Sequence, residues 1–452
     1  MPMADPFAPT NLQHAHALVM GLGRFGGGLG VTRYLLRHGA RVTLSDRGDR
    51  EALREPLSQL GEHERLRVVL GEHDAALLDG VDLLVVNPAV PRPWDHAFIQ
   101  AALARGIRVT TEIEIAYRLH DPDRVIAITG SAGKSTTSAM THHALNACAG
   151  KCVLGGNIGG SLLDRLDEIG DETSVVLELS SAMIHWLWGE QQPDPPRAPR
   201  VACITSYAPN HMDWHGDESH YRACKQRLIE VMGDQGRVIL PESLASWSAH
   251  THAPVELVND QAGVTGCVVP GTHNAMNASC AVACAFALHP EIDRNALVQG
   301  VRAFSGLPHR LNRALERDGV VYFDDSKSTT PQATMLAVSA LRETWRSDQI
   351  HLIAGGYDKG SDLSPVAQLA PDLAGLYTIG ATGSRLASDA SSNAIMCETL
   401  DRAMGCIIQR VEQGDVVLLS PGCASWDQFA NYEARGRRFI ELAQRPQGAT
   451  PC

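Results

Sequence analysis

The sequence predicts an α/β protein of about three domains, each built on a largely parallel sheet, and three observations support this. The chain has 452 residues, too many for one ordinary core at about 150 residues per domain. Short apolar runs typical of buried strands alternate with helix-like segments along its length. Hydrophobic residues make up 44% of the chain and aromatic residues only 5%, so many small side chains can pack helices closely on sheets.

The first region has the order strand, glycine turn, helix and strand. The apolar run ALVM leads into GLGRFGG, then the helix-like GVTRYLLRHG, then a second strand over 41–46. Gly21, Gly23 and Gly26 match GxGxxG, and Asp46 lies where an acidic side chain could meet a ribose. Taken alone, this pattern suggests a Rossmann-like domain that binds NAD. A tight helix–strand junction or another nucleotide would require the same glycines.

Further alternation of strands and helices sets the expected domain boundaries. The segments VDLLVVNPAV, AFIQAALARG and IRVTTEIEIAYRL continue the first unit, and HDPDR at 120–124 is typical of a linker. A new strand starts at Val125, and after GLPHRLN at 306–312 come VVYFDDSK, IHLIAGG, LYTIG and DVVLLSP. We therefore predict domains over 1–112, 113–307 and 308–452.

The stretch AITGSAGKSTT, between an apolar run and a helix-like segment, predicts a phosphate-binding loop. Small residues let several backbone N–H groups face one anion, the helix adds its positive N-terminal end, and Lys134 adds a full charge. The hydroxyl of Ser135 could reach a magnesium ion. Only two residues separate Gly130 from Gly133, so the motif is a shortened variant, and a Gly/Ser turn with an exposed lysine is the alternative. The expected nucleotide contacts in this loop are Gly130, Ser131, Ala132, Gly133, Lys134, Ser135 and Thr136.

Two further side chains are expected beside this loop. Glu178 in VLELSS ends a buried strand, where ligands collect in open parallel sheets, and a buried carboxylate needs a partner. That partner is either magnesium or an internal ion pair. His211 in NHMDWH follows the next strand, VACITSY, at the same topological position, which favours a metal or phosphate contact over a structural histidine.

Other candidates are weaker when judged from the residues alone. Lys225 in SHYRACKQRLIE would by itself be a solvent-exposed helix lysine. Asn274 and Asn277 in HNAMN share one helical face and could contact a base or ribose, although Asn274 could instead cap the helix. Arg310 and Lys327, with Asp325 beside them, lie near the expected domain junction, where an interdomain ion pair is the alternative.

Composition excludes several classes of protein. The formal net charge of −12 and the lack of a long Lys/Arg cluster argue against nucleic acid or a membrane surface as partner. No signal-like segment and no apolar run of about 18 residues is found, so we expect a cytoplasmic protein without a membrane span. The eleven cysteines form no CxxC pair, which favours reduced thiols over disulfides or a structural zinc site.

Taken in order, these motifs resemble those of the Mur ligase family, the ATP-dependent amide-forming ligases of peptidoglycan precursor synthesis. The resemblance covers nearly the whole chain, and the joint order of the motifs is far more specific than any one of them. It rests on ITGSAGKST, GGNIG, LELSS, NHMDWH, YRACK, HNAMN, GLPHR, DDSKST, GGYDKG and LSPGCASWDQFANYEARG. GLGRFGG and CASWDQF…YEARG look most like the members that add glutamate to UDP-N-acetylmuramoyl-L-alanine. The resemblance thus implies an N-terminal Rossmann-like domain for UDP rather than NAD, a central P-loop ATPase-like domain and a Rossmann-like C-terminal domain.

The resemblance also implies roles for individual residues. Lys134 would hold ATP phosphates, Ser135 and Glu178 one magnesium ion, and His211 a second. Lys225 matches the family's carbamylated lysine, in which added CO₂ makes a carboxylate-like magnesium ligand. The implied catalytic residues are Lys134, His211 and Lys225, and further ATP contacts are Asn277, Arg310 and Asp325. The implied substrate contacts are Gly23, Arg24, Phe25, Asp46, Asn157, Ser180, Thr329, Lys359, Ser425 and Tyr432.

The expected activity is ATP-dependent addition of D-glutamate to UDP-N-acetylmuramoyl-L-alanine by a monomer. The chain departs from the glutamate-adding pattern at Ala182 and Met183, where ELSSAM replaces ELSSFQ, and at Tyr432, where phenylalanine is usual. These departures affect the muramoyl and glutamate contacts and leave addition of L-glutamate as an alternative. A non-catalytic UDP-sugar sensor is another, but a sensor would not need the whole set of phosphoryl-transfer residues. Folylpolyglutamate synthase, a fold relative, fits the terminal motifs poorly.

Overall fold

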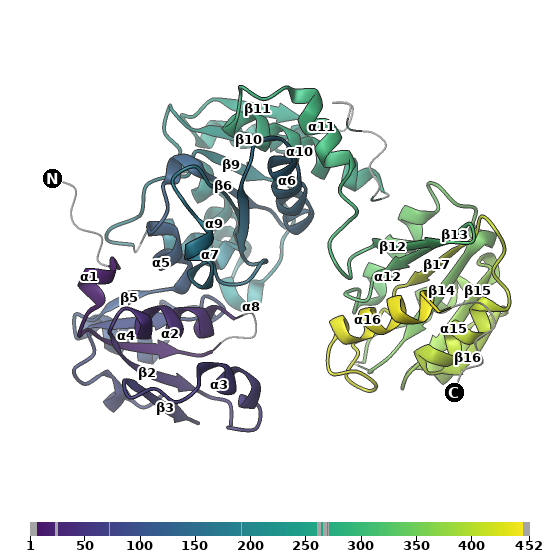
Figure 1. The fold of residues 1–452 in the computed structure, drawn as a ribbon, viewed down its shortest axis with the longest axis horizontal. Helices are drawn as coiled ribbons and strands as arrows, with labels where there is room; N and C mark the ends of the chain where they lie inside the picture. The colour runs from purple at the N-terminus through teal and green to yellow at the C-terminus, as the bar shows by residue number, and fades with distance from the viewer. Residues whose placement is uncertain are drawn as a thin grey trace. The chain divides into compact units, whose positions relative to one another are not determined.

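Two compact units make up the chain in the computed structural model (Figure 1). One comprises Met1–Gly263 and Met276–Val301, and the other Val264–Ala275 and Arg302–Cys452. The structure describes residues 7–22, 26–71, 73–190, 192–259, 264, 269, 271–358 and 360–445. Each unit is α/β with parallel sheets, which confirms the fold class expected from the alternating apolar runs.

The first sheet has five parallel strands in the order β3-β2-β1-β4-β5, which is the doubly wound Rossmann order without its sixth strand. Its strands are β1 (His16–Met20), β2 (Arg41–Asp46), β3 (Leu66–Leu70), β4 (Leu83–Val86) and β5 (Arg108–Thr110). The helices are α1 (Pro9–Leu12), α2 (Gly27–Arg37), α3 (Arg54–Leu60), α4 (Ala97–Ala104) and α5 (Glu112–Arg118). The order reverses at β1, so the crevice beyond its carboxyl end is where a ligand is expected.

The second sheet lies in the same unit and has six parallel strands in the order β11-β10-β9-β6-β8-β7. Its strands are β6 (Val125–Thr129), β7 (Cys152–Gly156), β8 (Ser174–Glu178), β9 (Val201–Ile204), β10 (Arg237–Pro241) and β11 (Val255–Val258). The helices are α6 (Lys134–Cys148), α7 (Ser181–Trp188), α8 (Met212–His215), α9 (Glu218–Glu230), α10 (Thr272–Leu288) and α11 (Arg294–Arg302). Residues of β6 and β8 are fully buried, as expected for central parallel strands with helices on both faces.

The third sheet, in the other unit, has the order β12-β13-β17-β14-β15-β16. Its strands are β12 (Asn312–Arg317), β13 (Val320–Asp324), β14 (Ile350–Gly355), β15 (Gly375–Ile379), β16 (Ala394–Glu398) and β17 (Val416–Leu419). The helices are α12 (Pro331–Leu341), α13 (Ser364–Ala367), α14 (Gly383–Asp389), α15 (Leu400–Ile408) and α16 (Tyr432–Ala443). The edge strand β12 is antiparallel to β13 and was not predicted from the sequence.

Short 3-10 helices complete the described secondary structure: η1 (Ala75–Leu78), η2 (Pro122–Arg124), η3 (Leu162–Asp164), η4 (Leu166–Glu168), η5 (Glu242–His250), η6 (Ser347–Gln349) and η7 (Ala370–Asp372). Across the described ranges, no helix combines the length and apolar character that a membrane crossing requires.

Candidate active site

The loop between β6 and α6 is shaped by close approaches that only glycine allows. Gly130 and Gly133 have φ values of 153° and 83°. A Cβ on Gly130 would lie 2.1 Å from Thr205 Oγ1, and one on Gly133 would lie 2.3 Å from Asn277 Oδ1. The loop is therefore packed against the residue that follows β9 and against α10, and a larger residue at either glycine would disturb this packing.

Lys134 begins α6, and its side chain folds back over the loop. Its Nζ donates hydrogen bonds to the carbonyl oxygens of Gly130 at 2.8 Å and Ser131 at 3.2 Å. The hydroxyl of Thr205 donates to Ala132 O at 2.6 Å and ties the far side of the loop to β9. The positive charge of Lys134 and the N-terminus of α6 thus lie at the same short loop. Such an arrangement is suited to binding an anion.

Glu178 lies beside this loop because its strand pairs in register with β6, Ile128 opposite Glu178. The side chain is 1% exposed, and its Oε1 accepts a hydrogen bond from Asn157 Nδ2 at 2.9 Å. Its Oε2 is buried and has no hydrogen-bond partner among the described residues. A buried carboxylate oxygen without a donor is costly, and a hard cation is the ligand that would satisfy it.

The same carboxylate tests the alternative of an internal ion pair. Among the ion pairs that join described residues, none includes Glu178. No salt bridge therefore supports the ion-pair alternative within the described part of the chain, although the charge of Glu178 acts on the buried Lys225. The oxygen of Glu178 that lacks a donor fits a magnesium ion. Ser135, the other expected ligand from the loop, is buried in the first turn of α6.

Lys225 is buried, although its helix alone would favour a solvent-exposed side chain. It lies on α9 with 1% of its surface exposed, and its Nζ donates to Gly130 O at 2.8 Å. Burial, and to a lesser extent the charge of Lys134, lower the pKa of the Lys225 ammonium to about 7. The two lysines thus share one carbonyl acceptor at the carboxyl end of the central sheet.

His211 lies next to the two lysines and precedes α8 with a left-handed backbone, φ 56°. Desolvation lowers the pKa of His211; Asp213 opposes this, and the charges of Lys134 and Lys225 lower it further. A neutral imidazole near two cations can bind a metal or accept a proton. Its ring centroid lies 6.4 Å from that of Tyr221, whose hydroxyl shares a 2.8 Å hydrogen bond with Ser131 Oγ.

The paired amides of α10 are both buried. Asn277 Oδ1 accepts a hydrogen bond from Thr137 Oγ1 at 3.3 Å, which places this amide against the first turns of α6. Asn274 falls inside α10, which begins at Thr272, so the helix-capping alternative for Asn274 is wrong. The structure therefore joins Asn277 to the phosphate loop.

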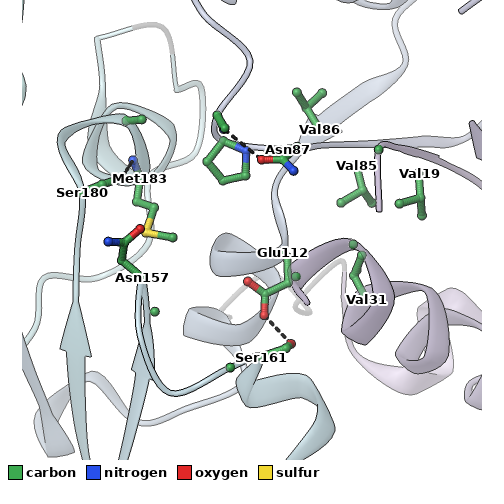
Figure 2. Close-up of a pocket in the computed structure, with 18 residues that line it drawn as sticks. Val19, Val31, Val85, Val86, Asn87, Glu112, Asn157, Ser161, Ser180 and Met183 are labelled. Atoms are coloured by element: carbon green, nitrogen blue, oxygen red, sulfur yellow. Dashed lines mark hydrogen bonds between the residues drawn. The ribbon is translucent and has the colours of Figure 1, made fainter. Parts of the chain in front are cut away.

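A cleft lies between the first and second sheets, and Figure 2 shows the side chains around it. From the N-terminal sheet it is lined by the glycine turn and Asn87, and from the central sheet by Asn157 and Ser180. Two of the expected substrate contacts thus share one cavity. Ala182 and Met183, where the chain departs from the family pattern, line the same cleft.

The glycine turn of the first sheet is only partly described. Gly23, Arg24 and Phe25 lie outside the described residues. Asp46 ends β2, and its carboxylate accepts hydrogen bonds from the backbone N–H groups of Leu22 and Gly48, each at 2.8 Å. The acidic side chain therefore holds the turn next to the cleft.

In the C-terminal unit, the expected contacts fall around β13, β17 and the start of α16. Asp325 is buried, accepts hydrogen bonds from Leu311 N at 3.0 Å and Ser420 Oγ at 2.7 Å, and has its pKa raised to about 6 by burial. Tyr432 is the first residue of α16, and burial raises its pKa to about 12, with Arg310 opposing the shift.

The remaining contacts of this unit are described less completely. Ser425 is buried, Thr329 is half-buried, and Lys359 lies outside the described residues.

Some contacts of the site region were not predicted from the sequence. Glu112 lines the cleft and accepts a hydrogen bond from Ser161 Oγ at 2.5 Å (Figure 2). Burial raises the pKa of Glu112 to about 7. In the C-terminal unit, the Nζ of Lys327 lies 5.6 Å from the ring centroid of Tyr432, a cation–π distance. No motif marks these pairs, because each joins residues far apart in the sequence.

Three family models match this chain. They are the Mur ligase MurD-like N-terminal domain over residues 15–111, the Mur ligase middle domain over 128–258, and the Mur ligase glutamate ligase domain over 309–423.

Similarity also extends over almost the whole chain. Two similar proteins, from Koribacter versatilis and Streptococcus pneumoniae, are both named UDP-N-acetylmuramoylalanine--D-glutamate ligase. The first is 33% identical over 95% of this chain and 97% of its own length. The second is 34% identical over 94% of this chain and 96% of its own length. The crystal structure of MurF from Acinetobacter baumannii shares the fold, with a TM-score of 0.56 at 17% identity over 96% of this chain and 92% of that one.

Proposed function

The chain belongs to the Mur ligase family, and on that premise we propose that it joins D-glutamate to UDP-N-acetylmuramoyl-L-alanine with cleavage of ATP. Relatives that match the chain almost from end to end carry the name of this activity. The structural observation that carries the mechanism is the convergence of Lys134, Lys225 and Glu178 at the carboxyl end of the central sheet. The reaction is a step of peptidoglycan precursor synthesis.

The chemistry explains why cations are needed at this point. A carboxylate condenses with an amine only after its oxygen becomes a good leaving group, and transfer of the γ-phosphoryl group of ATP achieves this as an acyl phosphate. The amine of glutamate then attacks, a tetrahedral intermediate forms, and phosphate leaves. Both steps gather negative charge, which prearranged positive groups stabilise. We assign this role on the β- and γ-phosphates to Lys134, at the start of α6, and to the loop N–H groups.

The residues that would hold magnesium are Ser135, Glu178, His211 and a carbamylated Lys225. The fit rests on Glu178 Oε2, which is buried and without a hydrogen-bond donor among the described residues. Bound magnesium would neutralise part of the phosphate charge. Asn157 donates to the other oxygen of Glu178 and so orients the carboxylate.

Carbamylation of Lys225 is supported by the surroundings of its amine. CO₂ adds to an unprotonated amine, and burial of Lys225 favours that form. The product would be an anion next to Lys134 and Gly130, where the ammonium now adds a second positive charge. A buried carbamate between a lysine and a metal is better compensated than two buried ammonium groups.

We place the substrates by the cavities and side chains that suit them. The nucleotide sugar would occupy the cleft lined by the glycine turn, Asn157 and Ser180. Glutamate would bind in the C-terminal domain through Lys359 and the hydroxyls of Thr329 and Ser425, because an ammonium and two hydroxyls suit two carboxylates. ATP, with Asn277, Arg310 and Asp325 as further contacts, would bind in the central domain. The expected location is the cytoplasm, where ATP and nucleotide sugars are made, and the expected state is a monomer.

The proposal is tested by phosphate release with each substrate omitted in turn. Release should require ATP, magnesium, UDP-N-acetylmuramoyl-L-alanine and glutamate together, and the nucleotide product should gain the mass of one glutamate residue. If no combination releases phosphate while the nucleotide sugar still binds, the chain is a UDP-sugar sensor and the ligase proposal fails.

A further inference from the structure

A second cluster of metal-binding side chains lies away from the phosphate loop. His185 on α7 and His220 and Cys224 on α9 each offer a ligand atom, and these atoms all lie within 4.8 Å of one another. His220 and Cys224 are four residues apart on one helix, so both face α7, which packs beside α9 (Figure 1). The proposed ligase reaction uses none of the three.

We propose that His185, His220 and Cys224 form a Zn²⁺ site that joins α7 to α9. Two imidazoles and one thiolate are a ligand set that zinc binds well, whereas magnesium prefers oxygen ligands. The magnesium of the ligase reaction would therefore not compete for it. Counting CxxC pairs does not detect such a site, because it uses one cysteine and takes its other ligands from histidines on two helices.

The distances in the cluster suit tetrahedral coordination. Cys224 Sγ lies 3.7 Å from His220 Nε2. With Zn–S near 2.3 Å and Zn–N near 2.0–2.1 Å, two tetrahedral ligands lie about 3.6 Å apart. This pair is therefore already at the spacing that a zinc ion requires. The other separations in the set are at most 4.8 Å, so a side-chain movement of about 1 Å brings all three atoms to this spacing.

A pocket next to the cluster leaves room for a fourth ligand. His185, His220 and Cys224 line it together with Trp94 and Glu190. The exposed Glu190 carboxylate acts electrostatically on His220, so it supplies negative charge on the open side. Water or this carboxylate can complete the coordination.

His220 is oriented by a chain of hydrogen bonds behind it. Its Nδ1 shares a hydrogen bond with His215 Nδ1 at 2.9 Å, and His215 Nε2 shares one with Ser181 Oγ at 2.8 Å. When His220 donates from Nδ1, its Nε2 keeps a lone pair that is available to a metal ion, and Nε2 lies 3.7 Å from Cys224 Sγ. An outer partner of this kind is typical of metal-binding histidines, because it sets the tautomer and the ring orientation.

Burial shifts the pKa of each of the three side chains in the cluster. Desolvation lowers the pKa of His185 to about 4 and also lowers that of His220, so both rings are neutral and able to bind metal at neutral pH. Burial raises the pKa of the Cys224 thiol to about 12.

The test uses metal-free full-length protein titrated with Zn²⁺, and with Co²⁺ as a spectroscopic substitute. We expect one Zn²⁺ per chain, a rise in the thermal midpoint, and a thiolate-to-cobalt charge-transfer band that saturates at one equivalent. Cys224→Ser should abolish the band, and both Cys224→Ser and His185→Gln should weaken Zn²⁺ binding by at least about 100-fold, the upper end of the loss seen for outer partners.

Matched controls separate this site from incidental binding to the other histidines and cysteines. Cys148→Ser and His252→Gln remove the same functional groups outside the cluster and should leave the Zn²⁺ affinity unchanged. The proposal is overturned if the cobalt complex lacks the thiolate band, or if Cys224→Ser and His185→Gln bind Zn²⁺ as the unmodified chain does. His185 is only half-buried, so His185→Gln tests the site even if Cys224→Ser folds poorly.

Discussion

At the scale of single residues, the burial of Lys225 next to a second lysine tells most about the proposed mechanism. A lysine with 1% exposure that donates to a loop carbonyl next to a second lysine is costly as an ammonium, because two buried positive charges repel. Conversion to a carbamate reverses the sign of one charge and supplies an oxygen ligand. We therefore propose that the Lys225 side chain is buried because it acts as a carbamate in the reaction.

Lys225→Ala should lose at least about 100-fold in kcat, because removing a preplaced charge-stabilising group typically costs that much. A short carboxylic acid in the assay should restore part of the activity by occupying the vacated space. Lys151→Ala, at an exposed lysine of the same domain, is the matched control and should keep full activity. Full activity of Lys225→Ala without added acid would show that the carbamate is not needed.

Glu112 gives a prediction about stability and pH. Its folded-state pKa is raised by burial from 4.5 to about 7, so the folded chain binds this proton more tightly than the unfolded chain does. The stabilising contribution is complete below about pH 4.5 and is lost as the pH rises through about 7. Glu112→Gln should therefore stabilise the protein near pH 8, by about 1 kcal/mol after allowing for solvent in the cleft.

Thermal midpoints measured between about pH 5 and pH 8 check this stability prediction. The advantage of Glu112→Gln over the unmodified chain should shrink toward the acidic end. Glu62→Gln, at an exposed position, should show no such trend. A constant difference between Glu112→Gln and the unmodified chain across this range would contradict the assigned titration.

At the scale of elements, the phosphate loop depends on how tightly it packs against α10 and the end of β9. Gly133 has φ 83°, and an added Cβ would lie 2.3 Å from Asn277 Oδ1. Gly150, just beyond the far end of α6, has φ 97° but nothing within 4 Å of the position of a Cβ. The two glycines share the same backbone restriction and differ in crowding.

Gly133→Ala should weaken ATP binding by roughly tenfold or more, because about 1–3 kcal/mol of strain would move the loop. Gly150→Ala should lower stability through its positive φ but leave the ATP dissociation constant unchanged. Fluorescence titration with a labelled ATP analogue measures both variants. Equal losses of affinity, or no loss for Gly133→Ala, would show that the close contact with Asn277 does not shape the nucleotide site.

The parallel strands could be predicted from the sequence, but the antiparallel edge strand could not. The parallel strands were predictable because buried strands are continuous apolar runs, such as VVL in β8 and VACI in β9. Strand β12, NRALER, was not predicted: its side chains are mostly half-buried, and its charges interrupt any apolar run. It is an antiparallel edge strand, whose position is set by pairing with β13 rather than by its own composition.

At the scale of the whole molecule, motif order and strand order together account for much of the site. Glu178 could be placed at the sheet edge because carboxyl ends of parallel strands meet there. The burial of Lys225, the bond between Glu112 and Ser161, and the cluster of His185, His220 and Cys224 could not be predicted. Each depends on tertiary contacts between distant segments, which local patterns do not encode.

The choice between D-glutamate and L-glutamate depends on how the whole molecule positions the amino acid. In the proposed site, Lys359, Thr329 and Ser425 would hold the two carboxylates of either enantiomer of glutamate. Fixing both carboxylates leaves the amine of only one enantiomer aimed at the acyl phosphate, and a misplacement of about 1 Å can cost roughly 100-fold in rate. Tyr432, in place of phenylalanine, brings an extra hydroxyl to the start of α16 and could rotate the substrate.

The most direct measurement compares D-glutamate and L-glutamate at equal concentration in the phosphate-release assay with ATP, magnesium and UDP-N-acetylmuramoyl-L-alanine. We predict turnover with D-glutamate and at least about tenfold slower release with L-glutamate, equivalent to ~1.4 kcal/mol of transition-state discrimination. A preference for L-glutamate would contradict the assigned substrate while leaving the ligase mechanism in place. Failure of both enantiomers to release phosphate would contradict the account as a whole.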